Sequence, residues 1–383
     1  MTKFYVPAIN LIGKGSLGEL GEELVNFGFK KAIIITDDFI AKSDILTKVI
    51  KEVETSNLEY VVFSNVDANP TTENVKNGLK VLEENNCDFI ISVGGGSPQD
   101  AASSISILAT NGGEPHDYEG VNKSKVAGLP VVAINTTAGT SAEVTINYVI
   151  TDEKRKVKMV CVDKNSLAVL TVNDPELMLS KPKGLTAATG MDALTHSIES
   201  LVTPGAYPVT EKLSMAAIEL IKENLPKAVE NGNDIEAREG MVNAVFLAGM
   251  AFSNAGLGYV HSMAHQLGSV YNLAHGVCCS MLLPIVEKEN AKREPQRFRK
   301  VAKAFGLDIE GKTDIECAEF SIKEIEDLSL EVGIPKKLTE LGIEEKDFDF
   351  ELLSKNALID ACAPGNPFEP TLEETVAMYK QLF

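Results

Sequence analysis

The chain has 383 residues, of which 44% are hydrophobic and 24% are charged, a balance typical of a folded globular protein and too apolar for a disordered one. Its net charge of −19 repels nucleic acid and anionic lipid, which argues against both as partners. The N-terminal residues lack the parts of a signal peptide, and no run reaches about 18 uninterrupted apolar residues, so we expect a cytoplasmic protein without a membrane span.

The first half of the chain alternates short β-branched runs with amphipathic runs. Strands are predicted at 31–36, 59–63, 88–93 and 129–134. Helices are predicted between them at 41–53, 71–85 and 101–111. Strands that alternate with helices imply a parallel sheet covered on both faces. Three more strands are expected in quick succession, at 145–151, 156–162 and 167–172, without long helices between them.

The second half of the chain has a different hydrophobic pattern, with helical spacing. Long stretches with helical spacing cover 183–203, 209–231 and 234–256, and no convincing strand follows. A proline and a glycine within 181–185 mark the boundary. We therefore predict a Rossmann-like α/β nucleotide-binding domain at 1–183 and an all-α domain at 184–383, to which the histidines and the resemblance described below add metal binding and catalysis, with ligands expected in the cleft between the two domains.

Two glycine-rich loops are candidates for binding a dinucleotide. GKGSLG at 13–18 fits G-x-G-x-x-G, and Asp37 and Asp38 follow about 20 residues later, as that fingerprint requires. VGGGSPQD at 93–100 follows a predicted strand, and its glycines allow a pyrophosphate to approach the N-terminus of the next helix. In the second loop, Ser97 and Asp100 also suit capping of that helix.

Polar side chains follow two other predicted strands. NTTAGTSAE at 135–143 is a small, hydroxyl-rich segment that suits either a cofactor loop or an ordinary turn. Asp37 ends the strand at 31–36, where a carboxylate can accept hydrogen bonds from the adenosine ribose and repel a 2′-phosphate. That position favours NAD over NADP, although Asp37 or Asp38 can instead cap the next helix.

Histidine is rare in this chain and concentrated in one segment. Three of the five histidines lie within 258–276, where His261 and His265 are four residues apart and His275 lies near a predicted helix end. Asp192 and His196 form a second pair at the same spacing, which places each pair on one helical face. Such a set of imidazoles and a carboxylate suits Zn²⁺ or Fe²⁺, whereas either pair alone is also common on an ordinary helix surface.

The chain's motifs carry a family resemblance. ATGMDALTHSIE, GYVHSMAHQLG and AHGV, with GGGSPQD and NTTAGTSAEVT upstream, resemble the iron-containing (group III) alcohol dehydrogenases nearly end to end. The likeness is nearest to the methanol, 1,3-propanediol and lactaldehyde (1,2-propanediol) branch. It implies a dehydroquinate synthase-like fold and an enzyme that transfers hydride reversibly between a short primary alcohol or diol, or its aldehyde, and NAD.

The resemblance also implies roles for individual residues. The family's metal ligands, for Fe²⁺ or another divalent ion, fall on Asp192, His196, His261 and His275, and its additional histidine falls on His265, a candidate proton carrier. The cofactor contacts fall on VGGGSPQD and other positions, not on GKGSLG. They are Asp37, Asn69, Gly95, Gly96, Ser97, Asp100, Thr136, Thr137, Thr140, Asn147 and Lys158. For Lys158, an ordinary solvated strand lysine is the alternative.

Three positions depart from the family pattern: Ser103 stands where lysine is common, Ile285 where histidine is common and Phe368 where arginine is common. The family implies a homo-oligomer, a dimer or larger. Two alternatives remain, namely a lyase of the dehydroquinate synthase type that uses NAD and a metal, and a catalytically weak scaffold of the same fold. The six cysteines form no C-x-x-C pair and are interpreted as reduced thiols, with Cys278 and Cys279 as candidates for oxidation.

Overall fold

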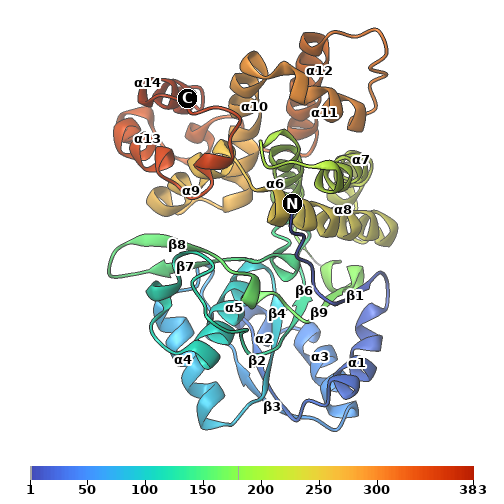
Figure 1. The fold of residues 1–383 in the computed structure, drawn as a ribbon. Coiled ribbons are helices and arrows are strands. Elements are labelled where there is room, and N and C mark those ends of the chain that lie inside the picture. The colour runs from blue at the N-terminus through green and yellow to red at the C-terminus, as the bar shows by residue number, and fades with distance from the viewer. Residues whose placement is uncertain (1, 180) are drawn as a thin grey trace. The chain divides into compact units, whose positions relative to one another are not determined.

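The structure, a computed structural model, describes residues 2–179 and 181–383. The chain forms two compact units, Met1–Leu179 and Ser180–Phe383. The first unit contains the strands and the second is built of helices (Figure 1). The predicted fold class, a parallel α/β unit followed by a helical one, is confirmed.

The first unit is built on a sheet of six parallel strands. Their order across the sheet is β1 (Ile9–Ile12), β9 (Leu170–Asn173), β6 (Val131–Asn135), β4 (Phe89–Gly94), β2 (Lys31–Ile35) and β3 (Glu59–Phe63). Ile33 lies opposite Val61 on one neighbouring strand and Ile90 on the other. The central strands are buried on both faces, which explains their continuous apolar runs.

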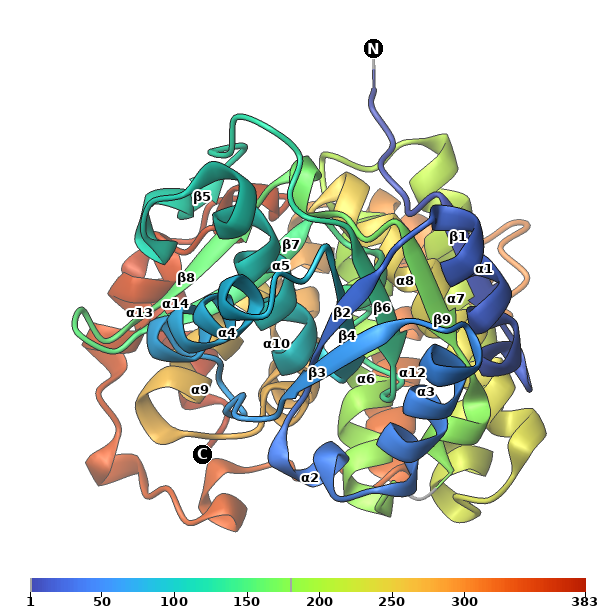
Figure 2. The same ribbon diagram turned by 90° about the horizontal axis from the view of Figure 1, so that it is seen from below.

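Helices cover both faces of this sheet (Figure 2). Alternate residues of a strand point to opposite faces, so Ile33 packs with α4 (Thr72–Glu84) and α5 (Gly96–Asn111), whereas Ile34 packs with α1 (Leu20–Phe27) and α3 (Asp44–Thr55). Two hydrophobic cores therefore enclose the sheet. All three helices predicted between the first strands are present.

A second, smaller sheet follows β6. It consists of β5 (Gly120–Val121), β8 (Val157–Val162) and β7 (Asn147–Asp152), in that order. β7 and β8 form an antiparallel pair, as expected for strands joined without a helix. Tyr148 and Met159 of this pair are buried in the same core as α5.

The second unit is helical throughout its described residues. The three long runs predicted from the sequence form α6 (Lys183–Val202), α7 (Pro208–Glu230) and α8 (Ile235–Ala255). The remaining α-helices are α9 (Tyr259–Tyr271), α10 (His275–Arg293), α11 (Phe298–Ala304), α12 (Asp314–Glu331), α13 (Phe350–Leu358) and α14 (Leu372–Lys380). α6 packs against α7, α8 and α10 and is buried from Thr186 onward on nearly all sides.

Among the residues that the structure describes, no single helix is both long enough and apolar enough to cross a bilayer. The pair α8 and α9 has sufficient length and apolar composition only when the two helices are taken together, and they are bent by 104° relative to each other.

The loops after β2 and β4 lie at the point where the strand order of the large sheet reverses. The chain runs from β2 outward to β3, returns to β4 on the other side of β2, and then continues outward through β6 and β9. In open parallel sheets, ligands bind outside the carboxyl ends of the strands at such a point. The segments that meet there begin with Thr36 and with Gly94.

Gly94 holds a backbone conformation that depends on glycine. Its φ is 153°, and a Cβ at this position would lie 2.5 Å from Pro98 Cγ. We expect Gly94→Ala to destabilise the first unit by roughly 1–3 kcal/mol and to lower its thermal unfolding midpoint. Gly18→Ala is the matched control because a Cβ on Gly18 meets nothing within 4 Å. Equal midpoints for both variants, measured by calorimetry, would contradict this expectation.

Candidate active site

Helix α6 places three ionisable side chains on one buried face. Asp192, His196 and Glu199 lie at spacings of four and three residues, so successive turns bring them to the same side of the helix. They are respectively 2%, 4% and 2% exposed, which removes all three from bulk water. The sequence analysis singled out Asp192 and His196 but missed Glu199, although it is the last residue of the ATGMDALTHSIE motif.

Helices α9 and α10 bring the other histidines. His261 and His265 lie on consecutive turns of α9. A helix was predicted to end at 274–276, and this position is wrong: α9 ends at Tyr271, Asn272 adopts a left-handed conformation, and His275 is the first residue of α10. Gly276 then lets α10 approach α6 closely, because a Cβ there would lie 2.4 Å from the Ala188 carbonyl oxygen. The close approach brings His275 to Asp192.

Four side chains form a compact cluster of ligand atoms. Asp192 Oδ1 lies 3.9 Å from His261 Nε2 and 3.6 Å from His275 Nε2. Cys279 completes the set, in which one ligand atom from each residue lies within 4.8 Å of all the others. His196, the remaining ligand predicted from the resemblance, is adjacent but outside this set, with its ring stacked on Phe252 and His261 at centroid distances of 4.2 and 4.7 Å.

The electrostatics of the cluster suit a cation. Burial raises the pKa of Asp192 and lowers that of His261 to about 3, which leaves the His261 ring neutral and able to act as a ligand. Among the described residues, neither Asp192 Oδ1 nor His261 Nε2 has a hydrogen-bond partner, although both are buried. Buried polar atoms in folded proteins rarely lack a hydrogen-bond partner. Oxygen, imidazole and sulfur donors at these separations fit a divalent metal ion.

Glu199 orients His261. One carboxylate oxygen contacts His261 Nδ1 closely, and the other accepts a hydrogen bond from the backbone N–H of Val260 at 2.8 Å. Burial raises the pKa of Glu199 to about 8, while the backbone N–H groups of Val260 and its neighbours oppose the rise by stabilising the carboxylate. A proton held between Nδ1 and Glu199 directs the lone pair of Nε2 toward Asp192, an arrangement common in metal sites.

A second buried carboxyl lies near Glu199. Glu287 is fully buried, accepts a hydrogen bond from Asn290 at 3.0 Å, and has a pKa raised to about 8 by burial and by the charge of Glu199. Asn290 and Asn366 exchange hydrogen bonds, and Asn366 also accepts one from the Tyr259 N–H. This polar layer ties α9 and α10 to the segment before α14.

Glu199→Gln tests the orienting role of this carboxylate. A glutamine has one acceptor oxygen for the two donors that Glu199 now satisfies, so either His261 Nδ1–H or the Val260 N–H loses its partner. We expect metal affinity to fall about 10–100-fold, measured by competition with a chromophoric chelator. Glu294→Gln is the control because Glu294 lies outside the cluster. Unchanged metal affinity in Glu199→Gln would show that Glu199 does not orient a ligand.

His265 forms a separate pair with Asp360. Its Nδ1 lies 3.0 Å from Asp360 Oδ2, and Gln266 also donates to that oxygen at 3.3 Å. Burial opposes ionisation of Asp360, but the charge and hydrogen bond of His265 lower its pKa. His265 is thereby held by a carboxylate and its ring stacks on His275 with centroids 5.6 Å apart. Asp360 was missed because it lies 95 residues away in sequence.

In the first unit, Asp37 has a structural role. It is the N-cap of α2 (Asp38–Ala41), and its Oδ1 accepts a hydrogen bond from Ile40 N at 2.8 Å. Capping was one of the two interpretations open from the sequence, and this bond does not test the second.

The loop after β4 differs from the expectation in one respect. The N-cap of α5 is Gly95, and no side chain caps the helix, so the interpretation of Ser97 and Asp100 as caps is wrong. Ser97 Oγ instead donates to the Ala68 carbonyl at 2.6 Å, because the loop lies against the segment before α4. With no side chain at Gly95 or Gly96, the first N–H groups of α5 remain accessible to an anion.

The threonine loop after β6 packs against this glycine loop. A Cβ on Gly95 would lie 3.0 Å from the Thr137 side chain, and one on Gly96 would lie 3.2 Å from Thr140. Thr136 Oγ1 is buried without a hydrogen-bond partner among the described residues. Two loops predicted separately from the sequence are therefore neighbours at the carboxyl edge of the sheet.

The remaining predicted cofactor residues are linked to one another. Lys158 Nζ donates to Asn69 Oδ1 at 2.9 Å, and because this bond is exposed, it is compatible with both interpretations of Lys158. Burial raises the pKa of Asp100 to about 8, while a backbone hydrogen bond from Val149 and the charge of Lys158 oppose that rise. Asn147 begins β7, opposite Val162 of β8. Asn69, Asp100 and Lys158 thus form one polar group beside the two loops.

The three departures from the family pattern lie on or beside helices. Ser103 is part of α5, and Ile285 is a partly buried residue of α10. The Phe368 ring packs under the guanidinium of Arg293, 3.9 Å from Cζ to centroid, a favourable cation–π contact. None of the three lies within the metal cluster.

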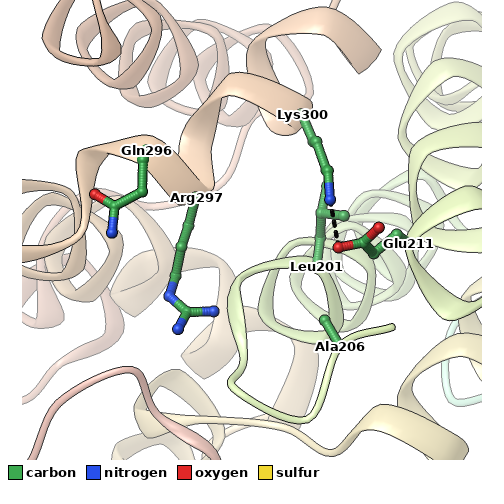
Figure 3. Close-up of a pocket in the computed structure, with 6 residues that line it drawn as sticks. All are labelled: Leu201, Ala206, Glu211, Gln296, Arg297 and Lys300. Carbon is green, nitrogen blue, oxygen red and sulfur yellow. Dashed lines mark hydrogen bonds and ion pairs between the residues drawn. The ribbon is translucent and has the colours of Figure 1, made fainter. Parts of the chain in front are cut away.

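The helical unit also contains a pocket of about 260 Å³ (Figure 3). Its lining residues are Leu201, Ala206, Glu211, Gln296, Arg297 and Lys300. Lys300 is paired with Glu211, as the dashed line in Figure 3 shows. None of the predicted site residues lines this pocket, so it is separate from the cluster.

A carboxylate–imidazole cluster in a helical unit, together with a glycine loop at the edge of a parallel sheet, suits both a dehydrogenase and the lyase alternative. Family models distinguish them: "Iron-containing alcohol dehydrogenase" matches residues 7–175, and "Fe-containing alcohol dehydrogenase family, C-terminal" matches residues 186–383. The chain belongs to the iron-containing alcohol dehydrogenase family, and it is an oxidoreductase.

Individual relatives agree over nearly the whole length. The chain is 46% identical to alcohol dehydrogenase 4 of Schizosaccharomyces pombe, over 99% of this chain and 89% of the relative. It is 43% identical to the NAD-dependent methanol dehydrogenase of Bacillus methanolicus, over 99% of each. A crystal structure of a 1,3-propanediol oxidoreductase superposes with a TM-score of 0.97 at 42% identity, covering 100% of both chains. The predicted family and branch are confirmed.

Proposed function

We propose that this chain oxidises short primary alcohols or diols to aldehydes, reversibly, with NAD as the cofactor and a divalent metal at the α6–α9–α10 cluster. The observation that carries the proposal is the pair of buried ligand atoms, Asp192 Oδ1 and His261 Nε2, that lack hydrogen-bond partners among the described residues. The names of the relatives, which include methanol and 1,3-propanediol dehydrogenases, support the substrate class.

The proposed metal ligands are Asp192, His196, His261 and His275, and Fe²⁺ is the proposed ion, with Zn²⁺ as the alternative. When bound, the ion supplies a Lewis acid for the substrate oxygen, and the nicotinamide supplies the hydride acceptor. Asp192 and His261 are each only 2% exposed, so these two ligand side chains are shielded from bulk water. Glu199 holds His261 in the orientation that this role requires.

His265 is the proposed proton carrier. Oxidation of an alcohol releases a proton as well as a hydride, and an imidazole is the side chain best matched to proton transfer near neutral pH. Asp360 accepts a hydrogen bond from Nδ1–H of His265, and Nε2 of the same ring remains available to exchange a proton with substrate or solvent. Asp360 acts through His265 and is therefore a positioning residue.

The proposed NAD site uses the carboxyl edge of the large sheet. The N–H groups at Gly95 and Gly96 face the pyrophosphate, and Thr136, Thr137 and Thr140 line the dinucleotide. Asn69, Ser97, Asp100, Asn147 and Lys158 complete the proposed contacts. Asp37 accepts hydrogen bonds from the adenosine ribose with the oxygen that does not cap α2, which favours NAD over NADP.

The experiment that tests the function measures NADH formation by the metal-stripped chain before and after Fe²⁺ is added back, over a panel of short alcohols and diols. Restored activity is expected, and the panel ranks the substrates. Absence of turnover in the presence of bound metal and bound NAD would overturn the dehydrogenase assignment.

Two further properties are inferred from the sequence and the family. We infer a homo-oligomer, a dimer or larger, which sedimentation of the purified chain tests. We also infer a cytoplasmic location and no nucleic-acid partner, in keeping with the charge of −19.

A further inference from the structure

Cys279 belongs to the metal cluster by position. It lies one helical turn after His275 on α10, so both side chains lie on the same face of that helix. Its Sγ is 3.6 Å from His275 Nε2, and Cys279 is fully buried, as are Asp192 and His261, whereas the His275 side chain is 38% exposed. The other members, Asp192 and His261, each offer a ligand atom within 4.8 Å of that sulfur.

The separations between these atoms are close to those between donors that share one ion. Metal–nitrogen and metal–oxygen bonds of about 2.0 Å and a metal–sulfur bond of about 2.3 Å place neighbouring donors roughly 3.3–3.8 Å apart at tetrahedral angles. The distances from Cys279 to His275 and from His275 to Asp192 are both 3.6 Å and fall in that range, and the distance from His261 to Asp192, 3.9 Å, lies just above it. A single ion can therefore reach the sulfur with little movement of the backbone.

We propose that the Cys279 thiolate is a ligand of the metal, in addition to the nitrogen and oxygen donors of the proposed function, on which this inference rests. The thiol loses its proton when the ion binds, as cysteine ligands do. A sulfur donor makes the site softer, because thiolate favours Zn²⁺ and similar borderline ions over harder ones. The Cys279 thiolate is thus expected to raise the affinity of the cluster for Zn²⁺ relative to Fe²⁺, compared with the same site without sulfur.

Cobalt substitution tests the assignment directly. The full-length chain is stripped with chelator and titrated with Co²⁺, and bound metal is counted by equilibrium dialysis. One Co²⁺ per chain and a strong near-ultraviolet band from thiolate-to-cobalt charge transfer are expected. Cys279→Ser is expected to bind Co²⁺ without the band. Cys278→Ser is the matched control, since Cys278 is the adjacent buried cysteine outside the cluster, and it retains the band.

Competition between metals gives a second readout. We expect the preference for Zn²⁺ over Fe²⁺ to fall about tenfold or more in Cys279→Ser, the scale on which metal sites respond to loss of a supporting group. If Cys279→Ser does not fold, X-ray absorption of the unaltered zinc-loaded chain decides, because a sulfur neighbour at about 2.3 Å is expected. A shell of only nitrogen and oxygen overturns the proposal.

The outcomes separate this inference from the proposed function. Bound Co²⁺ without a thiolate band, or a band that persists in Cys279→Ser, overturns the role of Cys279 and leaves the metal site intact. Failure to bind any divalent ion overturns both. A thiolate band together with no NAD-linked alcohol oxidation supports Cys279 and overturns the dehydrogenase function.

Discussion

Replacement of His261 with alanine is expected to remove the bound metal and to lower NAD-linked alcohol oxidation at least about 10³-fold, since metal polarisation contributes several kcal/mol and each 1.4 kcal/mol is roughly a factor of ten. The structural reason is that the His261 ring lies between two carboxylates of α6: its Nε2 is 3.9 Å from Asp192 Oδ1, and its Nδ1 contacts Glu199. Alanine leaves Asp192 and Glu199 buried without the ring that links them.

Metal content by plasma emission spectroscopy and initial rates of NADH formation are the measurements. His116→Ala is the control, because His116 lies on the first unit with its side chain 54% exposed. Circular dichroism establishes that the variant is folded. A folded His261→Ala chain that keeps its metal and most of its activity would remove His261 from the site.

Replacement of His265 with alanine is expected to separate proton transfer from metal binding. Loss of a positioned acid or base costs about 10²–10⁴-fold in rate, so turnover should fall within that range while metal content stays at the level of the unaltered chain. The basis is that His265 Nδ1 is bound to Asp360, 3.0 Å away, and the residue is not part of the four-residue cluster.

Asp360→Asn supplies the second readout for this pair. The substitution removes the charged acceptor that holds His265 Nδ1, so turnover is expected to fall while metal content stays at the level of the unaltered chain. Unchanged turnover in Asp360→Asn would show that Asp360 does not position His265. Equal loss of metal in His265→Ala and His261→Ala would overturn the division of roles between the two histidines.

Much of the fold could be predicted from local patterns. Continuous apolar runs such as 31–36 predicted buried parallel strands, because those residues have no solvent-facing side. The runs at 183–203 and 209–231 predicted helices from their spacing alone. β1 was not predicted because it has only four residues and none of them is fully buried, so its sequence carries no long apolar run. The helix end predicted near His275 was wrong because α9 already ends at Tyr271, where Asn272 adopts a left-handed conformation.

The site could be predicted only where its residues recur at helical spacing. Asp192 with His196, and His261 with His265, are visible as pairs because one helix sets their separation. Cys279 also lies four residues after His275, but the pair was missed because a helix end was predicted near His275, whereas α10 begins there. Asp360 carries no such signal, because it reaches His265 across 95 residues of sequence. The capping interpretation of Ser97 failed for the same reason, since its partner, Ala68, belongs to another loop.

The burial of α6 on nearly all sides has a consequence for the folding of the helical unit. A buried polar atom without a hydrogen-bond partner costs about 1–3 kcal/mol of folding free energy. Asp192 Oδ1 on α6 and His261 Nε2 on α9 are two such atoms among the described residues. An ion bound between them offsets this penalty only in the folded state, so its binding energy becomes folding energy. If the proposed metal site is correct, the ion completes the interior of the helical unit, and we expect the metal-stripped chain to unfold at a lower temperature than the metal-loaded chain.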